Sequence, residues 1–275
     1  MALVPKKDDV EYRLNHLVVK NLPRDYLGLS QIGNKCHRFL QYYHYWAFES
    51  EIDNRISRLF GFGHMMEQQM INDLADIEIF VSGEQKEVVG AGGHWKGHCD
   101  GEAISASDID QKFLVEFKTH NDKNFKALKK DGVRKAYPGH YGQCMSYMGY
   151  LELPFCFYLA YNKNDSEYYY EIIYFDEEAF SEYKRKEVEI ITSDALLPRI
   201  GNNTASWFEC KMCDARSTCF GRTAIPITCR TCKNVDVLDE GNWACTIKAD
   251  FINPILSSEE QRAACDEYQL GDMFK

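Results

Sequence analysis

The spacing of apolar residues changes after Ala75, and this change constrains the fold more than any other feature of the sequence. Before Ala75, apolar residues recur at helical intervals, which predicts helices over 29–48 and 52–75. After Ala75, short β-rich runs are separated by Gly, Ser and Asp, which indicates a meander of strands. The expected strands cover 77–82, 85–89, 94–105 and 112–120.

The second half of the chain returns to helical spacing and then to strands. A helix should begin after Pro138 and include 140–151, and two strands should follow at 155–162 and 168–175. Segment 177–195 is typical of an amphipathic helix, because its charges gather on one side. The order of helices, strands, helix, strands and helix predicts a mixed α/β core.

The character of the chain changes again at Trp207, beyond which short segments carry closely spaced cysteines. A boundary is expected between Arg222 and Pro226. A chain of 275 residues is long enough for one sizeable core and a small appendage. We therefore predict a core over 1–222 and a small cysteine-rich domain over 223–275.

Charge and hydropathy exclude several classes of protein. A formal net charge of -10 argues against a protein that coats nucleic acid non-specifically. No apolar run approaches the roughly 20 residues that span a bilayer, and the N-terminal segment lacks the apolar stretch of a signal peptide. The absence of a GxxxxGK[ST] loop excludes an ATP motor of that kind. We expect a soluble, intracellular protein without a membrane partner.

Three residues on two neighbouring strands have the chemistry of a metal-dependent hydrolytic site. Mg²⁺ prefers hard oxygen ligands, usually a few carboxylates, and it neutralises charge and acidifies water in phosphodiester hydrolysis. Alternation along the strand puts Glu116 and Lys118 on one face, with Phe117 buried behind. Strand pairing would bring Asp100 opposite Glu116, and the Phe117 carbonyl would add a ligand. Lys118 would orient or help deprotonate the attacking water and hold the phosphate.

A Glu-x-Lys pair alone is common on exposed strands, where it forms an ordinary cross-strand ion pair. The surrounding motifs give this pair more weight. GHMME, GHCDGE, VEFKTH and QCMSY occur in that order, and the order resembles the RecB-type branch of the PD-(D/E)XK nucleases over about residues 30–219. That branch has a helix-borne His, a GxxD strand, a (D/E)xK strand and a QxxxY helix. The resemblance implies a restriction-endonuclease-like core, in which helices flank a central mixed sheet.

The resemblance also implies roles for individual residues. His64 matches the helix-borne His, a nitrogen ligand of the catalytic metal, and Gly97 and Asp100 match GxxD. The implied ligands of Mg²⁺ or Mn²⁺ are His64, Asp100, Glu116 and the carbonyl of Phe117. The implied catalytic residues are Asp100, Glu116, Lys118, Gln143 and Tyr147. Gln143 and Tyr147 lie four residues apart and share one helix face, from which they would contact substrate or Lys118.

Several of these residues also have a purely structural interpretation. Taken singly, His64 is typical of a partly buried structural histidine, and Gln143 and Tyr147 are typical of packed core residues. Glu67, one turn after His64, and Glu102, on the strand face of Asp100, would either support the metal ligands from behind or stand exposed.

The segment after Lys118 is rich in Lys and Arg. The ordinary interpretation of a charge run is a solvated helix face. Because this run begins at the proposed catalytic lysine, we favour a contact with DNA. The expected DNA-binding residues are Lys123, Lys126, Lys129, Lys130 and Arg134.

Eleven cysteines without a secretory signal indicate metal binding rather than disulfides. Three of them lie in apolar surroundings and are expected to fill space in the core: Cys99, Cys144 and Cys156. FECKMCDARSTCF holds three more around a Cys-x-x-Cys pair, and Cys36 is the nearest candidate by motif for a fourth ligand. This layout resembles the iron–sulfur nucleases of the same branch, including AddB and the CRISPR-associated exonucleases. The resemblance implies a [4Fe–4S] cluster on Cys36, Cys210, Cys213 and Cys219, and zinc on the same thiols is the alternative.

A second set of thiols follows at Cys229, Cys232, Cys245 and Cys265. Two close thiols, then one, then another predict a tetrahedral Cys₄ zinc site, since no histidine follows His140. A segment this short, with few large apolar groups, needs such a staple in order to fold. The site would contact DNA, contact a partner or serve structure alone, and the alternative is a floppy tail with free reduced cysteines.

Together these features predict a Mg²⁺- or Mn²⁺-dependent deoxyribonuclease, and an exonuclease on DNA ends in preference to an endonuclease. A structure- or sequence-selective endonuclease is a second hypothesis, because PD-(D/E)XK cores serve both modes. A third is a non-catalytic DNA-binding or assembly module scaffolded by its metal sites. Segment 116–150 and the cysteine-rich tail also resemble nucleases of tailed bacteriophages. That resemblance suggests phage DNA processing or recombination in the cytoplasm of a bacterial host, with recombination or replication proteins as partners.

Overall fold

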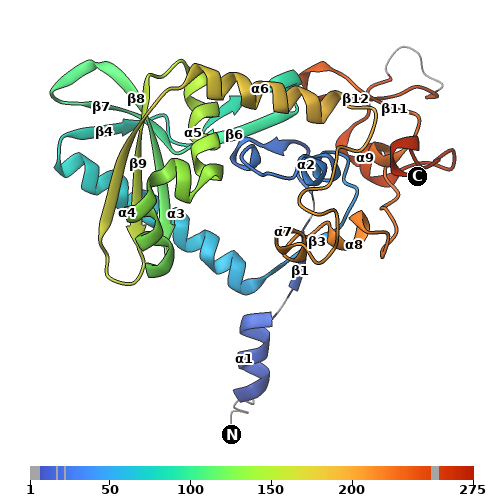
Figure 1. The fold of residues 1–275 in the computed structure, drawn as a ribbon, viewed down its shortest axis with the longest axis horizontal. Helices are drawn as coiled ribbons and strands as arrows, with labels where there is room; N and C mark the ends of the chain where they lie inside the picture. The colour runs from blue at the N-terminus through green and yellow to red at the C-terminus, as the bar shows by residue number, and fades with distance from the viewer. Residues whose placement is uncertain (1–6, 17, 22, 249–253) are drawn as a thin grey trace, which may run out of the picture.

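The computed structural model describes residues 7–16, 18–21, 23–248 and 254–275. Its centre is a five-stranded sheet in the order β10-β9-β8-β7-β4 (Figure 1). Strands β8 and β9 are parallel and the other neighbouring pairs are antiparallel, so the sheet is mixed, as the sequence predicts. The five strands are β4 (Ile79–Ser82), β7 (Gly101–Ser105), β8 (Asp108–His120), β9 (Phe155–Asn162) and β10 (Tyr168–Tyr174).

Helices cover both faces of this sheet, because β8 presents large apolar side chains on both. On one face, Val115 and Phe117 pack in a cluster with Met70 and Leu74 of α3. On the other face, Leu114 belongs to a larger core built with α4, α5 and α6. These helices are α3 (Asn54–Asp76), α4 (Asp122–Ala136), α5 (Pro138–Leu151) and α6 (Glu177–Thr192).

Local sequence explains where the covering helices begin. Asn121 and Asp176 are the N-caps of α4 and α6, and their side chains accept hydrogen bonds from Asn124 N and Ala179 N. Pro138 stands in the first turn of α5, where its missing N–H costs no hydrogen bond. Within the described part of the chain, none of the helices combines the length and the apolar character that crossing a membrane requires.

Shorter elements surround the central sheet. A three-stranded sheet has the order β2-β6-β5, and two-stranded sheets join β1 to β3 and β11 to β12. These strands are β1 (Val18–Asn21), β2 (Leu27–Gly28), β3 (Ser50–Asp53), β5 (Lys86–Val89), β6 (Trp95–Cys99), β11 (Val235–Val237) and β12 (Trp243–Cys245). The remaining helices are α1 (Lys7–His16), which projects from the body in Figure 1, α2 (His37–His44), α7 (Phe208–Lys211), α8 (Arg216–Cys219) and α9 (Ser258–Ala263).

Two sequence predictions of local structure were wrong in part, and one helix was not predicted. The helix expected over 29–48 is reduced to a 3-10 turn and α2, because the chain crosses α5 so closely that a Cβ at Gly33 would lie 2.4 Å from the Cα of Gly139. The strand expected over 94–105 divides at Asp100 into β6 and β7, which belong to different sheets. Helix α4 was not predicted as an element, because its buried apolar residues are few and stand among many charged ones. These residues are Phe125, Leu128 and Val133.

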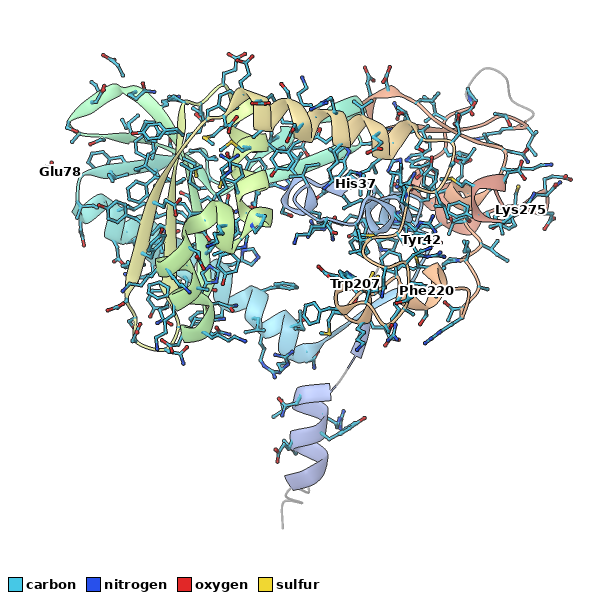
Figure 2. The ribbon with its side chains drawn as sticks, viewed as in Figure 1. His37, Tyr42, Glu78, Trp207, Phe220 and Lys275 are labelled. Carbon is cyan, nitrogen blue, oxygen red and sulfur yellow. The ribbon has the colours of Figure 1, made fainter. Side chains whose placement is uncertain are left out.

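The C-terminal segment packs directly against α2. The buried Arg230 lies between the rings of Trp46 and Trp243, with its guanidinium carbon 3.8 Å and 4.4 Å from the two ring centroids. Tyr42 of α2, which is labelled in Figure 2, packs edge-on against Phe274 with the ring centroids 6.2 Å apart. The division into 1–222 and 223–275 therefore stays a prediction, and the two parts share an aromatic core.

Candidate active site

Strand β8 carries the two charged residues of the (D/E)xK motif on one face, as its alternation predicts. Glu116 is fully buried on the face covered by α5, whereas Phe117 points to the α3 side. Lys118 Nζ pairs with Glu116 Oε1 and donates to the carbonyl of Phe117 at 3.1 Å. The ordinary cross-strand pair is thus replaced by a contact within one strand, which holds the ammonium over its own backbone.

Asp100 reaches this face from the junction between β6 and β7. Gly101 pairs with Val115, so Asp100 precedes the paired region and stands level with Glu116. Phe117 N donates to Asp100 Oδ2 at 2.7 Å, which fixes the carboxylate beside β8. The structure therefore brings Asp100, Glu116 and Lys118 together from two segments, as we expected.

Asp100 and Glu116 lie close together, and burial is the main cause of the pKa shift of each carboxyl group. Burial and then the nearby charge of Asp100 raise the pKa of Glu116 to about 8, although Lys118 opposes the shift. Burial also raises the pKa of Asp100, against the charge of Lys118 and the Phe117 N–H. Burial disfavours the ammonium of Lys118, but Glu116 and Asp100 outweigh it and raise its pKa.

One oxygen of the cluster has no partner among the described residues. Glu116 Oε2 is buried and accepts no hydrogen bond there, and an unpaired buried carboxylate oxygen is costly. An oxygen beside a second carboxylate and a backbone carbonyl suits a hard cation such as Mg²⁺ or Mn²⁺. The donor set of Asp100, Glu116 and the Phe117 carbonyl therefore fits the predicted metal.

His64 lies near this cluster and is paired with Glu67 rather than with Asp100 or Glu116. It stands on α3 with 73% of its side chain exposed, and its Nδ1 is 3.5 Å from Glu67 Oε1. The charges of His64 and Glu67 both contribute to the pKa of Asp100, so both side chains lie near its carboxylate. Glu102, by contrast, pairs with Lys86 and lies 3.6 Å from Lys112, so its ion pairs join it to neighbouring strands.

The QxxxY and GxxD motifs meet on this face. Tyr147 Oη donates to the carbonyl of His98 at 3.1 Å, and Gln143 hydrogen-bonds the same hydroxyl. Both side chains are buried, Gln143 with 7% exposed. A Cβ at Gly97 would lie 2.5 Å from Tyr147 Oη, so only glycine lets α5 approach β6 this closely.

The proposed DNA-binding residues all lie exposed on α4, but several are already paired. Lys126 contacts Asp122 at 2.8 Å, and Lys129 contacts Glu167 at 2.9 Å. Arg134 lies 3.5 Å from an Asp176 oxygen. Lys123 and Lys130 form no ion pair with any described residue, so the two of them are the cations most available to a phosphate.

The first cysteine set gathers between α2 and the segment that follows α6. Cys36, Cys210 and Cys213 line one pocket. Cys219 lies near enough to raise the pKa of both Cys210 and Cys213. Burial and then the neighbouring thiols raise the pKa of Cys213 to about 11. Cys219 Sγ accepts a hydrogen bond from Arg199 Nε at 3.3 Å.

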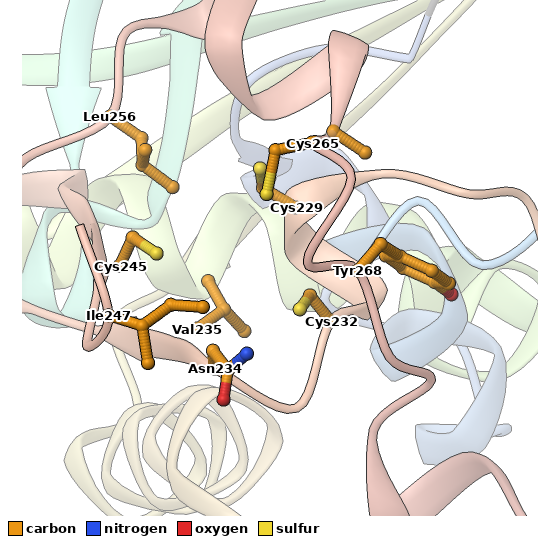
Figure 3. A pocket seen from close by; sticks show the side chains of 10 residues that line it. Cys229, Cys232, Asn234, Val235, Cys245, Ile247, Leu256, Cys265 and Tyr268 are labelled. Atoms are coloured by element: carbon orange, nitrogen blue, oxygen red, sulfur yellow. The ribbon is translucent and has the colours of Figure 1, made fainter. Parts of the chain in front are cut away.

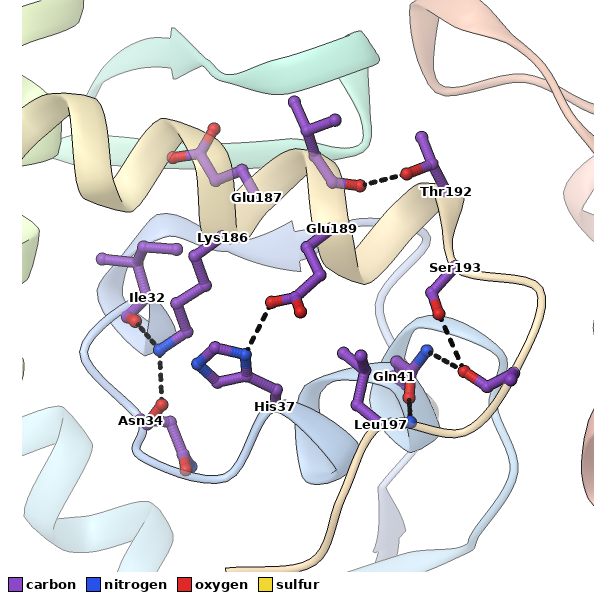
Figure 4. Close-up of polar contacts among 12 residues, drawn as sticks. Ile32, Asn34, His37, Gln41, Lys186, Glu187, Glu189, Thr192, Ser193 and Leu197 are labelled. Carbon is purple, nitrogen blue, oxygen red and sulfur yellow. Dashed lines mark hydrogen bonds and ion pairs between the residues drawn. The ribbon is translucent and has the colours of Figure 1, made fainter.

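Helix α6 holds the loop that leads into α2 (Figure 4). Lys186 Nζ donates to the carbonyls of Ile32 and Asn34, each at 2.5 Å. Glu189 Oε2 lies 2.8 Å from His37 Nδ1. These contacts fix the backbone around Cys36 and so fix the distant first thiol of the set.

The second cysteine set lines one narrow pocket. Cys229, Cys232, Cys245 and Cys265 surround it together with the side chains of Val235 and Leu256, among others (Figure 3). Burial and then the other three thiols raise the pKa of Cys229 to about 11. Four thiols that oppose one another's ionisation are a donor set suited to a cation.

Neither the cysteine sets nor the carboxylates stand in a finished coordination geometry. Among the described residues, no three His, Cys, Asp or Glu side chains are close enough to hold a metal ion as they stand. All three metal sites therefore stay predictions. Cys99, Cys144 and Cys156 are fully buried in apolar surroundings, which confirms them as core residues.

Sequence reasoning missed a further group on the Glu116 face. Tyr158 pairs with Glu116 across the parallel strands β8 and β9, and its hydroxyl lies 2.8 Å from His140 Nδ1. His120, two residues after Lys118, approaches the same hydroxyl at 3.4 Å. The strand register that joins these residues is not readable from one sequence.

The fold overlaps several solved structures in part. An alkaline exonuclease from Laribacter hongkongensis, LHK-Exo, matches 67% of this chain and 90% of its own, with 15% identity and a TM-score of 0.45. LHK-Exo in complex with dAMP matches 60% and 86%, with 13% identity and a TM-score of 0.45. The structure of SSO0001 matches 74% and 90%, with 15% identity and a TM-score of 0.42. The sequence matches no protein-family model and no curated protein, and overlaps this distant do not assign an activity.

Proposed function

We propose that the chain is a divalent-metal-dependent deoxyribonuclease with a PD-(D/E)XK centre, and that it acts from DNA ends. The observation that carries this proposal is the convergence of Asp100, Glu116 and Lys118 on one face of β8, with Glu116 Oε2 buried and unpaired. A structural ion pair needs neither a second carboxylate nor an unpaired buried oxygen. A phosphodiester hydrolase needs both acids for its cation and a positive group for the phosphate.

Asp100, Glu116 and the Phe117 carbonyl would hold Mg²⁺ or Mn²⁺, and His64 would join them by turning on α3. When bound, the metal supplies a Lewis acid and lowers the pKa of a coordinated water. The ammonium of Lys118 remains charged beside its two acids and would hold the scissile phosphate in place. Tyr147, held by Gln143, would donate to the His98 carbonyl and so keep the β6–β7 junction at Asp100 in place beside β8.

The outer residues would serve binding and structure. Lys123 and Lys130 of α4 would meet the DNA backbone, and Lys126, Lys129 and Arg134 would exchange their present partners for phosphates. The first cysteine set would hold a [4Fe–4S] cluster, with zinc as the alternative, and the second would hold zinc. The thiols of each set lie close enough together to raise one another's pKa, and this supports both assignments. Phage DNA processing or recombination in a bacterial host is the setting we propose.

The experiment that tests the proposal is a time course on end-labelled linear single- and double-stranded DNA, with circular DNA as a control. We expect hydrolysis with Mg²⁺ or Mn²⁺, none in excess EDTA, and intact circles. Asp100→Ala, Glu116→Ala and Lys118→Ala should each abolish hydrolysis in a folded protein. Cleavage of circles would assign an endonuclease instead, and binding without cleavage by the wild type would assign a non-catalytic module.

A further inference from the structure

Three rings form a stack where β8 ends and α5 begins. His120 is the last residue of β8, Tyr137 precedes α5, and His140 lies in its first turn. The ring centroids of His120 and Tyr137 are 4.7 Å apart, and those of Tyr137 and His140 are 5.0 Å apart. The two histidines are thereby held at fixed positions on the face that carries Glu116 and Lys118.

A buried hydroxyl joins the two histidines. Tyr158 has no exposed surface, and its Oη lies 2.8 Å from His140 Nδ1 and 3.4 Å from His120 Nε2. A tyrosine hydroxyl has one proton, so it donates to one imidazole and accepts from the other. We assign the hydroxyl proton to the shorter contact, so that Tyr158 donates to His140 Nδ1 and accepts from His120 Nε2–H, and the tautomer measurement below tests this assignment.

This arrangement fixes the proton of His140 on the other nitrogen. Burial and the charge of Lys118 lower the pKa of His140 to about 3, and burial, Lys118 and Lys163 lower that of His120 to about 4, so both rings are neutral near pH 7. With Nδ1 accepting, the single proton of a neutral His140 is on Nε2. This N–H has no hydrogen-bond partner among the described residues, and the ring is only half-buried.

The surroundings of this N–H favour an anion. The ammonium of Lys118 lies near enough to His140 to help lower the pKa of the imidazole, so a cationic group stands on the same side of the sheet. The carboxyl ends of the parallel strands β8 and β9 also meet here, which is where α/β sheets tend to bind ligands. A neutral N–H donor beside an ammonium group suits a phosphate oxygen and does not suit a cation.

We propose that His140 binds the substrate, with its Nε2–H donating to a phosphate oxygen of the DNA strand next to the phosphate held by Lys118. Tyr158 and His120 are positioning residues that fix the tautomer of His140. This proposal rests on the proposed nuclease function and adds a contact that sets how the strand lies in the site.

Steady-state kinetics on end-labelled DNA test the proposal with a matched set of variants. His140→Asn keeps a group that can accept from Tyr158 but has no donor at the Nε2 position, whereas His140→Gln carries an amide N–H there. Because the contact is to a neighbouring phosphate, His140→Asn should raise KM about tenfold or more with kcat nearly unchanged. His140→Gln should recover most of that loss, Tyr158→Phe should raise KM less, and Tyr161→Phe on the same strand should behave as wild type.

Imidazole ¹⁵N spectroscopy of the wild type gives a second readout, independent of activity. We expect the Nε2–H tautomer for His140 near pH 7, and the Nδ1–H tautomer in its place would overturn the proposal. An active wild type whose KM is unaffected in His140→Asn and Tyr158→Phe would overturn it too, and would leave the nuclease function intact. A wild type that neither binds nor cleaves DNA would remove both proposals.

Discussion

Gly97 and Tyr147 fit against each other without space for another atom. A Cβ at position 97 would lie 2.5 Å from Tyr147 Oη and 2.9 Å from its Cε1. The phenol lies across β6 and donates to the carbonyl of His98, the next residue. The glycine of the GxxD motif and the tyrosine of the QxxxY motif are therefore two halves of one contact, which holds Asp100 at the edge of β8.

We predict that Gly97→Ala destabilises the protein, because the methyl group must displace a buried ring. Overpacking of this kind costs about 1–3 kcal/mol, and denaturant unfolding should show it. Gly61→Ala on α3 is the matched control, since a Cβ there meets no atom within 4 Å. That variant should be neutral or slightly more stable, because alanine favours a helix. Equal stability of the two variants would contradict the contact.

The sequence alone predicted which residues share a face of β8. It did not predict how the neighbouring segments bring Asp100 and Tyr158 to that face. Alternation sufficed to put Glu116 and Lys118 together, because the side-chain period of a strand is fixed by geometry. The division at Asp100 into two sheets and the pairing of Tyr158 with Glu116 depend on long-range register. Helix α4 was missed for a related reason, since its few apolar residues gain meaning only where they meet the sheet.

The unpaired Glu116 oxygen predicts that a divalent cation stabilises the folded protein. Mn²⁺ at a hundredfold excess over its Kd should add about 2.7 kcal/mol to the free energy of unfolding. Glu116→Gln and Asp100→Asn should remove that gain. Glu102→Gln should keep it, because Glu102 is paired with Lys86 and Lys112 instead. Thermal melting in EDTA and in Mn²⁺ measures this, and an undiminished shift in Glu116→Gln would place the cation elsewhere.

The contacts of Arg199 predict how tightly the first cysteine set would keep the metal that we propose for it. Its guanidinium donates to both the sulfur and the carbonyl of Cys219. A hydrogen bond to a charged sulfur contributes about 1.5–3 kcal/mol, so Arg199→Gln should release iron or zinc to a chelator about tenfold faster or more. Arg185→Gln is the control, because this exposed arginine of α6 forms its ion pair within the described part of the chain with Glu182 alone. Identical metal content and release rates in the two variants would exclude this role.

From the contacts of Arg230 we predict that the cysteine-rich segment and the core unfold together. Its guanidinium donates to the carbonyls of His44 and Asp25 and to the Gln261 side chain, while it stacks between two tryptophan rings. Arg230→Leu leaves three acceptor oxygens without this donor, two of them buried, and removes both cation–π contacts, which should cost at least about 3 kcal/mol.

Urea unfolding followed by tryptophan fluorescence measures this loss, because the stacked rings report on the junction itself. The control is Arg222→Leu, an exposed arginine whose side chain makes no hydrogen bond or ion pair with the described residues, and it should unfold as the wild type does. If residues 223–275 were an independent domain, the wild type would show two transitions and Arg230→Leu would shift only one of them. A single transition that moves as a whole is the outcome we expect, because the ring and guanidinium stack is common to both parts.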